Sequence, residues 1–224
     1  MEERNVVKFK KEEYAIRDYI RTSIGKGGIS KVKIEYAPVG ERIIISTSKP
    51  GLVIGRGGEK IDELTRTLKK RFSLENPHIE VDEIRVPEYD AQIMADDIAM
   101  SLERFGPLRF KVIAYRTLQR IMGAGALGAE IRLSGKLPGS RAKTWRFAQG
   151  YLKKTGDSAK IVDKAQSRAE TKPGTVGVKV EILSPEVKNP YEIKINEEMI
   201  EEIRKNIEGP EEEIKPKKKT KKTK

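Results

Sequence analysis

A glycine-rich tetrapeptide is the segment of this sequence best suited to bind a charged ligand. Gly55-Arg56-Gly57-Gly58 joins two short apolar segments, residues 52–54 and the segment around Ile61. Glycine at both ends of a turn leaves the backbone uncovered and tolerates positive φ. A sugar-phosphate chain can then approach the N–H groups at the start of the next helix, where the helix dipole favours negative charge. We therefore expect Gly55, Arg56, Gly57, Gly58 and Lys60 to form an RNA-binding clamp.

The elements around this clamp determine which kind of glycine turn it is. Apolar periodicity predicts a helix at 12–24, strands at 29–37 and 41–48, a helix at 58–72 and a strand at 78–87. The two helices should each carry an apolar stripe, made of Tyr14, Ile16, Tyr19, Ile20 and Ile24 in the first and of Ile61, Leu64, Leu68 and Phe72 in the second. Helix, strand, strand, clamp, helix and strand is the order of a KH domain, whose Gly-x-x-Gly loop holds about four nucleotides. A dinucleotide-binding loop would need a glycine at Lys60, and Gly51 does not lead into a Walker loop. The remaining alternative is an ordinary helix–helix turn.

The second half of the chain predicts another α+β unit. A helix at 90–105 begins at the capping residue Asp90, and a second helix spans 108–124. Strands are expected near 129–134, 143–151, 159–171 and 176–183. A short amphipathic helix at 197–207 and a disordered lysine-rich tail should follow. The expected organisation is a type II KH domain with a three-stranded sheet (1–89), an α+β domain with two helices and a small sheet (90–185), and an extension (186–224).

The positive charge is concentrated in two places. The chain carries 46 Lys and Arg against 34 Asp and Glu, a net charge of +12. Residues 1–108 are balanced, with 19 basic and 19 acidic residues, whereas residues 109–160 contain 12 basic and 2 acidic residues. Seven lysines lie in residues 215–224. Such blocks of like charge point to a polyanionic partner, and RNA is the first candidate.

The helix around residue 115 is the first candidate for that contact. At about 100° per residue, Arg109, Arg116 and Arg120 fall on one stripe, and the apolar residues Phe110, Ala114, Leu118 and Ile121 lie on another side. The helix itself offers this stripe no acidic partners, so the arginines repel one another unless an anion is bound. A solvated charged face is the alternative.

A loop and the strand after it provide the second candidate. Residues 134–147 contain Lys136, Arg141, Lys143 and Arg146, with no acidic residue in the segment to neutralise them. We expect these four cations to contact phosphates. Phe147 is expected in the core, and the sequence leaves the place of Trp145 open.

Several functional classes are excluded or disfavoured by composition. The chain has no cysteine and one histidine, His78, so metal clusters built on these residues are not expected. No apolar run is long enough to span a membrane. The pairs Asp62-Glu63 and Asp96-Asp97 diverge around their helices and do not form an acid–base pair. We expect no catalytic residue, metal or cofactor. The enzyme alternative that stays open is a nuclease or lyase with an activated lysine.

Several segments together resemble a known family. The clamp, Ser134-Gly135-Lys136-Leu137, Arg141-Ala142-Lys143 and Gly177-Val178-Lys179-Val180 are similar to the KH-containing family of the third protein of the small ribosomal subunit, in its archaeal and eukaryotic form. The resemblance runs in order from about Val6 to Pro185.

The resemblance implies a place and a role. Proteins of this family sit on the head of the small subunit, bind ribosomal RNA and neighbouring head proteins, and line the channel through which messenger RNA enters. It implies a cytoplasmic, ribosome-associated protein whose helix with Arg109, Lys111, Arg116 and Arg120 holds and unwinds the message. The family usually has two adjacent basic residues at the positions of Lys111 and Val112; Val112 departs from that pattern, and Arg109 or Arg116 is the candidate substitute. A free KH-type regulator outside the ribosome is the alternative.

Overall fold

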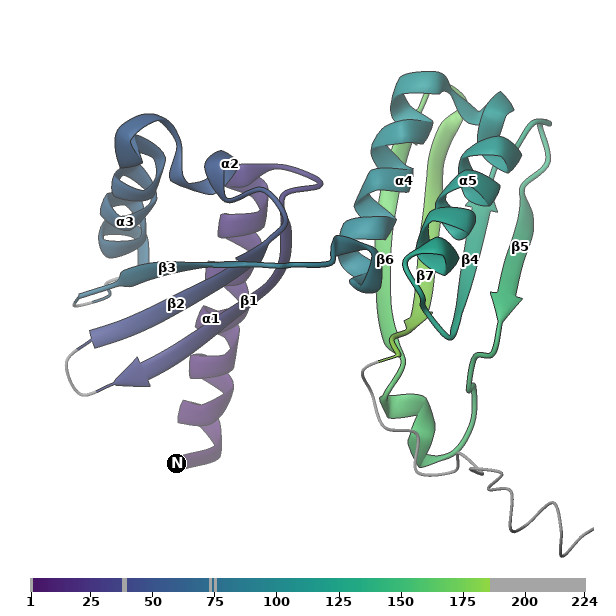
Figure 1. The fold of residues 1–224 in the computed structure, drawn as a ribbon. Coiled ribbons are helices and arrows are strands. Elements are labelled where there is room, and N and C mark those ends of the chain that lie inside the picture. Colours follow the sequence, from purple (N-terminus) through teal and green to yellow (C-terminus); the bar gives the residue numbers. More distant parts are fainter. Residues whose placement is uncertain (1, 38–39, 73, 75, 186–224) are drawn as a thin grey trace, which may run out of the picture. The chain divides into compact units, whose positions relative to one another are not determined.

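The computed structural model describes residues 2–37, 40–72, 74 and 76–185. The described residues belong to one compact unit. The helix expected at 197–207 and the lysine-rich tail lie outside the described residues. The described part is α+β, with a three-stranded sheet followed by a four-stranded sheet (Figure 1), and this confirms the predicted fold class.

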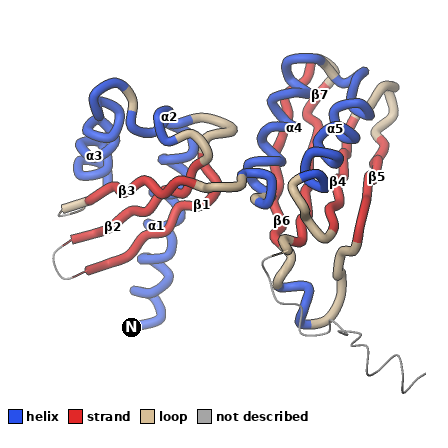
Figure 2. The backbone as a smooth tube through the Cα atoms, in the orientation of Figure 1, coloured by secondary structure: helices blue, strands red, loops and turns tan. Residues whose placement is uncertain are grey.

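The N-terminal domain follows the predicted order of elements. These are α1 (Glu2–Ile24), β1 (Ile29–Ala37), β2 (Gly40–Thr47), α2 (Pro50–Ile54), the 3-10 turn η1 (Arg56–Gly58), α3 (Glu59–Phe72) and β3 (His78–Glu83). The strands lie in the order β1-β2-β3 (Figure 2). β1 is antiparallel to β2, and β3 is parallel to it. The parallel pair is possible because α2 and α3 form the crossover between its strands. The predicted strand 78–87 ends early, at Glu83, before Pro87 opens a 3-10 turn.

The core of this domain holds both sides of the clamp. Val53 of α2 and Leu64 and Leu68 of α3 are buried against the sheet. Ile61 and Phe72 are partly buried in the same cluster, which confirms the predicted stripe of α3. The clamp therefore connects two helices that are each fixed by apolar contacts.

The first helix is longer than the sequence pattern indicates. It begins at Glu2 rather than near residue 12. Val6 and Phe9 in the added turns are 59% and 42% exposed, so these turns show no apolar stripe on a core. Their many Glu, Lys and Arg residues have good helix propensity, and the ring centre of Phe9 lies 4.3 Å from that of Tyr36 in β1.

One buried position on α1 was also assigned wrongly. Ile16 and Ile20 are buried as expected, but Tyr14 is 71% exposed and Glu13 is buried in its place. Glu13 accepts hydrogen bonds from Lys10 and Arg17. The hydrogen bond from Lys10 is the main reason that the pKa of Glu13 lies below its ordinary value of 4.5. A buried carboxylate with two cationic partners cannot be recognised from an apolar pattern.

The C-terminal domain places two helices before four strands. Its elements are η2 (Pro87–Tyr89), α4 (Ala91–Phe105), η3 (Pro107–Arg109), α5 (Phe110–Gly123), β4 (Gly128–Gly135), β5 (Lys143–Gly150), η4 (Asp157–Lys160), β6 (Asp163–Thr171) and β7 (Gly174–Leu183). Asp90 accepts hydrogen bonds from the N–H groups of Gln92 and Ile93, which confirms it as the cap of α4. The strand predicted from 159 starts only at Asp163, because a 3-10 turn occupies 157–160.

The four strands form an antiparallel sheet in the order β5-β4-β7-β6. Helices α4 and α5 lie on one face of it (Figure 1). Ile131 and Leu133 of β4 and Val178 and Val180 of β7 are buried in the core on that face. Because side chains alternate along a strand, the residues between them lie on the opposite face. Of the described helices, none covers that opposite face, which we call the open face.

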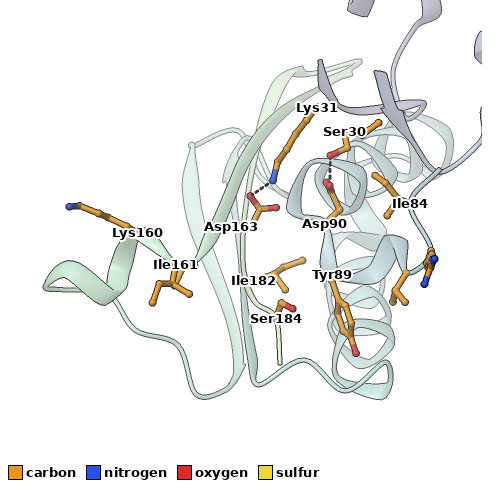
Figure 3. A pocket seen from close by; sticks show the side chains of 14 residues that line it. Ser30, Lys31, Ile84, Tyr89, Asp90, Lys160, Ile161, Asp163, Ile182 and Ser184 are labelled. Carbon is orange, nitrogen blue, oxygen red and sulfur yellow. Dashed lines mark hydrogen bonds and ion pairs between the residues drawn. The ribbon is translucent and has the colours of Figure 1, made fainter. Parts of the chain in front are cut away.

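Polar contacts connect the first strand of the N-terminal domain with the start of α4. Ser30 donates a hydrogen bond to Asp90, and Lys31 forms an ion pair with Asp163 at 3.4 Å (Figure 3). Asp163 also accepts a hydrogen bond from the N–H of Ala91 at 3.0 Å. These side chains border a cavity of about 690 Å³. Asp90 and Asp163 therefore serve two purposes, as partners of β1 and as acceptors at the N-terminus of α4.

Candidate nucleic-acid interface

The clamp has a backbone conformation that side chains rarely adopt. Gly55 has φ +74° and ψ −173°, and Gly57 has φ +61°. An added Cβ at Gly57 or Gly58 would meet no atom within 4 Å, so this part of the turn is open to a partner. The side chain of Arg56, which lies between Gly55 and Gly57, is exposed. The turn thus presents bare backbone and one guanidinium at the start of α3, where the positive end of the helix dipole lies.

Gly55 is required for a different reason. A Cβ at this position would lie 2.8 Å from Cγ and 3.0 Å from Cβ of Lys60. Lys60 passes back across the turn, and its Nζ donates a hydrogen bond to the carbonyl of Leu52 at 3.3 Å. The missing side chain at Gly55 therefore allows a second cation to lie beside the clamp.

The clamp borders a shallow depression. Gly51, Gly55, Arg56, Glu59 and Lys60 line about 480 Å³ of space there. The structure brings together Gly55, Arg56 and Lys60 of the predicted clamp residues in this lining. Leu52 and Ile54 of α2 are 46% and 37% exposed. Their exposure next to a polar clamp provides apolar contact area that the sequence pattern did not assign to the site.

Helix α5 orients its faces largely as expected. Phe110, Ala114, Leu118 and Ile121 are buried in the core. Arg109 and Arg116 are exposed and form no ion pair with other described residues. These two arginines thus remain available to an anion.

Arg120 does not fit the expectation that this stripe lacks acidic partners. Its Nη2 lies 2.7 Å from Asp97 and its Nε lies 4.0 Å from Glu88. Both carboxylates come from segments that precede α5, so they are invisible on a projection of α5 alone. The expected isolation of Arg120 was wrong, because packing against η2 and α4 supplies its counter-charges.

Lys111 lies apart from the arginine stripe. Its Nζ is 4.8 Å from the centre of the Trp145 ring and 6.0 Å from that of Phe110. Trp145 is partly buried against Phe110, at 5.3 Å between ring centres, and Phe147 is buried as predicted. The open question about Trp145 is thus answered: it packs at the edge of the core and carries Lys111 on its face.

The loop between β4 and β5, together with the first residue of β5, carries exposed cations. Lys136, Arg141 and Lys143 are exposed, and they form no ion pair within the described part of the chain. Leu137 is buried and holds the loop against the domain. These three positions keep the unneutralised character that the sequence indicates.

Arg146 differs from Lys136, Arg141 and Lys143, because its charge is already paired. Its Nε and Nη2 donate to the two carboxylate oxygens of Glu130, at 2.8 and 3.1 Å. Glu130 lies opposite Ala148 in the pairing of β4 with β5, two residue pairs from the Arg132–Arg146 pair and on the same face of the sheet. The expectation that nothing neutralises Arg146 was therefore wrong, because strand pairing supplies an acid from 16 positions earlier.

Glu130 has further cationic partners that the sequence did not single out. Arg132 Nε donates to it at 2.6 Å, and Lys154 also forms an ion pair with it. The Glu130 side chain has no exposed surface. Burial alone would raise its pKa, but the hydrogen bonds from Arg146, Lys154 and Arg132 outweigh this effect and lower its pKa to about 2. A rule that looks for an acid in a basic block would have found Glu130, since residues 109–160 contain only two acids.

The described residues provide no alternative site for metal chemistry or membrane insertion. They include no group of three or more His, Asp or Glu side chains placed to hold a metal ion. No helix in this part of the chain is long and apolar enough to cross a membrane.

Comparison with known proteins matches both domains. A model of the KH domain matches residues 15–89, and a model described as ribosomal protein S3, C-terminal domain, matches residues 98–182. The N-terminal domain is therefore a KH domain, and its α-β-β-α-α-β order and parallel β2–β3 pair agree with the predicted type II form.

Curated archaeal relatives match almost the whole chain. The small ribosomal subunit protein uS3 of Methanocaldococcus jannaschii is 44% identical over 199 residues, which are 88% of this chain and 95% of the relative. The protein of the same name from Methanosphaera stadtmanae is 39% identical, over 92% of this chain and 82% of the relative. That of Methanococcus maripaludis is 39% identical, over 95% of this chain and all of the relative. The uS3 proteins are structural proteins and not enzymes, which argues against a nuclease or lyase. The chain belongs to the uS3 family of ribosomal proteins.

Proposed function

We propose that this protein is a structural component of the small ribosomal subunit that binds ribosomal RNA. The uS3 relatives are named for that subunit, and the described residues of both domains include exposed cations. Backbone amides and the heads of lysine and arginine neutralise phosphates, so affinity should fall as salt is raised. We propose three segments with the expected bounds: a KH domain at 1–89 with the clamp, an α+β domain at 90–185 with the basic residues, and an extension at 186–224.

The observation that carries the proposal is the geometry of the clamp. Gly57 and Gly58 leave open space above the backbone, and Arg56 and Lys60 stand beside it. This combination suits a single-stranded RNA backbone with about four nucleotides. Leu52 and Ile54 offer apolar surface for the bases of the same strand.

The finer part of the proposal concerns messenger RNA. We propose that the protein sits in the head of the subunit, beside neighbouring head proteins, and contacts messenger RNA where it enters. Arg109 and Arg116 are its strongest candidates on α5, since they are exposed and have no described acidic partner. The set also includes Lys136, Arg141 and Lys143. It further includes three cations that already have a partner within the chain: Lys111 on the Trp145 ring, Arg120 with Asp97, and Arg146 with Glu130.

The location we propose is cytoplasmic and ribosome-associated. Sedimentation of cell extract that contains the tagged protein tests this proposal. We expect the protein to travel with small subunits at low salt and to be released at high salt, because phosphate contacts are screened. A protein that stays at the top of the gradient at low salt would instead favour the free KH-type regulator.

A further inference from the structure

The open face of the four-stranded sheet contains a charged cluster that no sequence motif indicates. Glu130 lies on this face and is nevertheless fully buried. Arg132, Arg146 and Lys154 cover it, each within bonding distance of its carboxylate. A carboxylate with no exposed surface fixes the three cations in place, because each is bonded to one common acceptor.

Strand pairing extends the cluster into a row. Arg132 of β4 lies opposite Arg146 of β5 on one side and opposite Lys179 of β7 on the other. The row Arg146–Arg132–Lys179 therefore crosses three adjacent strands, about 10 Å at the usual strand spacing. Like charges placed opposite each other on neighbouring strands repel. This repulsion must be offset by the carboxylates in the next row or by a bound anion.

The carboxylates do not offset it completely. The neighbouring row contains Glu130 and Glu181 as its acids, and four cations, the three of the row and Lys154, stand against these two. Lys179 is exposed and forms no ion pair with a described residue. Arg132 uses only Nε for Glu130, so its two terminal nitrogens have no described hydrogen-bond partner. The row keeps an excess of positive charge and unused donors that point to an anionic ligand.

The shape and composition of the face narrow the class of ligand. The four strands contain two aromatic residues, Trp145 and Phe147, and both pack against Phe110 of α5 on the helix side. The open face thus has no ring from these strands on which an unpaired base could stack, which is what binders of single strands use. Double-helical RNA is recognised instead through its phosphates and 2′-hydroxyls, with little reading of sequence.

From these observations we infer that Arg132, Arg146 and Lys179, held by Glu130, form a second RNA site that binds the phosphate backbone of double-helical RNA. The inference rests on the proposed function, since it assigns a further class of RNA structure to the same protein. The site differs from the clamp in position, in ligand and in the groups it uses.

Two binding measurements with the full chain test the site. The probes are a mixed-sequence RNA duplex of about 16 base pairs and a single-stranded RNA, each followed by fluorescence anisotropy over a range of salt. The test variant is Arg132→Gln with Lys179→Gln. We expect duplex affinity to fall roughly 10–50-fold and the slope of log K against log salt to decrease by about 2, one for each lost contact. Affinity for the single strand should stay unchanged.

The matched control is Lys160→Gln with Lys172→Gln, which removes the same charge from exposed positions outside the row. It should leave duplex affinity near that of the wild type. Equal losses in the test and control variants, or an unchanged duplex affinity in the test variant, would overturn the inference. A test variant that keeps its duplex affinity but no longer joins small subunits would point to an acidic protein on this face and would also overturn it. If the wild type binds neither RNA, the proposed function itself fails.

Discussion

The clamp and the open face achieve a cationic surface in opposite ways. The clamp is contiguous in sequence, uses bare backbone at Gly57 and Gly58, and fixes its conformation through glycine. The open face is assembled from three strands and uses side chains that a buried acid, Glu130, holds in place. The difference shows that a cationic surface can be built by the absence of side chains in one domain and by a buried counter-charge in another.

The largest effect should come from placing acids in the clamp. The double substitution Arg56→Asp and Gly57→Asp should weaken binding of single-stranded RNA by about 100-fold or more, because the turn then carries two negative charges that repel phosphates. The fold should survive, since an added Cβ at Gly57 meets open space and Asp tolerates the left-handed region better than most residues. Filter binding and thermal melting measure the two effects. Undiminished RNA affinity would contradict the clamp assignment.

Replacing Glu130, the buried acid of the open face, should lower the free energy of unfolding. The pKa of Glu130 is about 2, below its ordinary 4.5, so its stabilising effect is present above about pH 4.5 and is lost as pH falls toward 2. Glu130→Gln should cost about 1–3 kcal/mol at neutral pH, with solvent around the half-exposed cations limiting the loss. It should also remove that part of the acid sensitivity. Denaturation at pH 7 and at lower pH measures this, with Glu170→Gln as the exposed control. Parallel acid curves for wild type and Glu130→Gln would refute it.

A pair of alanine variants separates the two roles of glycine inside the clamp. Gly55→Ala introduces both an unfavourable backbone conformation and a contact with Lys60, so we expect a loss of about 1–3 kcal/mol. Gly57→Ala faces open space and should cost about 1 kcal/mol, from the left-handed conformation alone. Urea unfolding of both variants gives the comparison. Equal losses would mean that the approach of Lys60 to Gly55 is not important for stability.

The smallest effects should distinguish the arginine of α5 that forms ion pairs, Arg120, from Arg116, which forms none with the described residues. Arg120→Gln removes contacts with Asp97 and Glu88 and should lower stability by about 0.5–1 kcal/mol, as is usual for a partly exposed ion pair. Arg116→Gln should leave stability within about 0.5 kcal/mol and reduce RNA affinity a few-fold. Melting and anisotropy on both variants check the contrast. A larger loss of RNA affinity for Arg120→Gln than for Arg116→Gln would reverse it.

The parts of the molecule that sequence could predict are those with a local physical cause. The glycine turn at 55–58, the cap at Asp90 and the stripe of α3 depend on residues within one or two turns of each other, and all three are present as expected. The first turns of α1 were missed because their apolar residues stay largely exposed, apart from the contact of Phe9 with Tyr36, and so leave no apolar period.

The charge pairs were missed because they depend on tertiary structure. Arg146 meets Glu130 across a strand pair, and Arg120 meets Asp97 across two helices. Counting charge along the chain correctly located the basic block, but it could not say which cations had partners. For the same reason Arg132 and Lys179, unremarkable in sequence, emerge as neighbours only when the strand register is known.

The strand order of the four-stranded sheet affects how newly made chains avoid aggregation before they bind RNA. β5 lies at one edge, so its outer backbone groups have no strand partner among the described residues. An edge of this kind invites a second copy to add its own strand. β5 carries Lys143 and Arg146 and no acid, whereas the opposite edge, β6, carries Lys164 and Arg168 together with Asp163 and Glu170. Two copies approaching each other through β5 would bring cations together, so the same residues that we propose contact RNA also discourage aggregation of newly made chains through this edge.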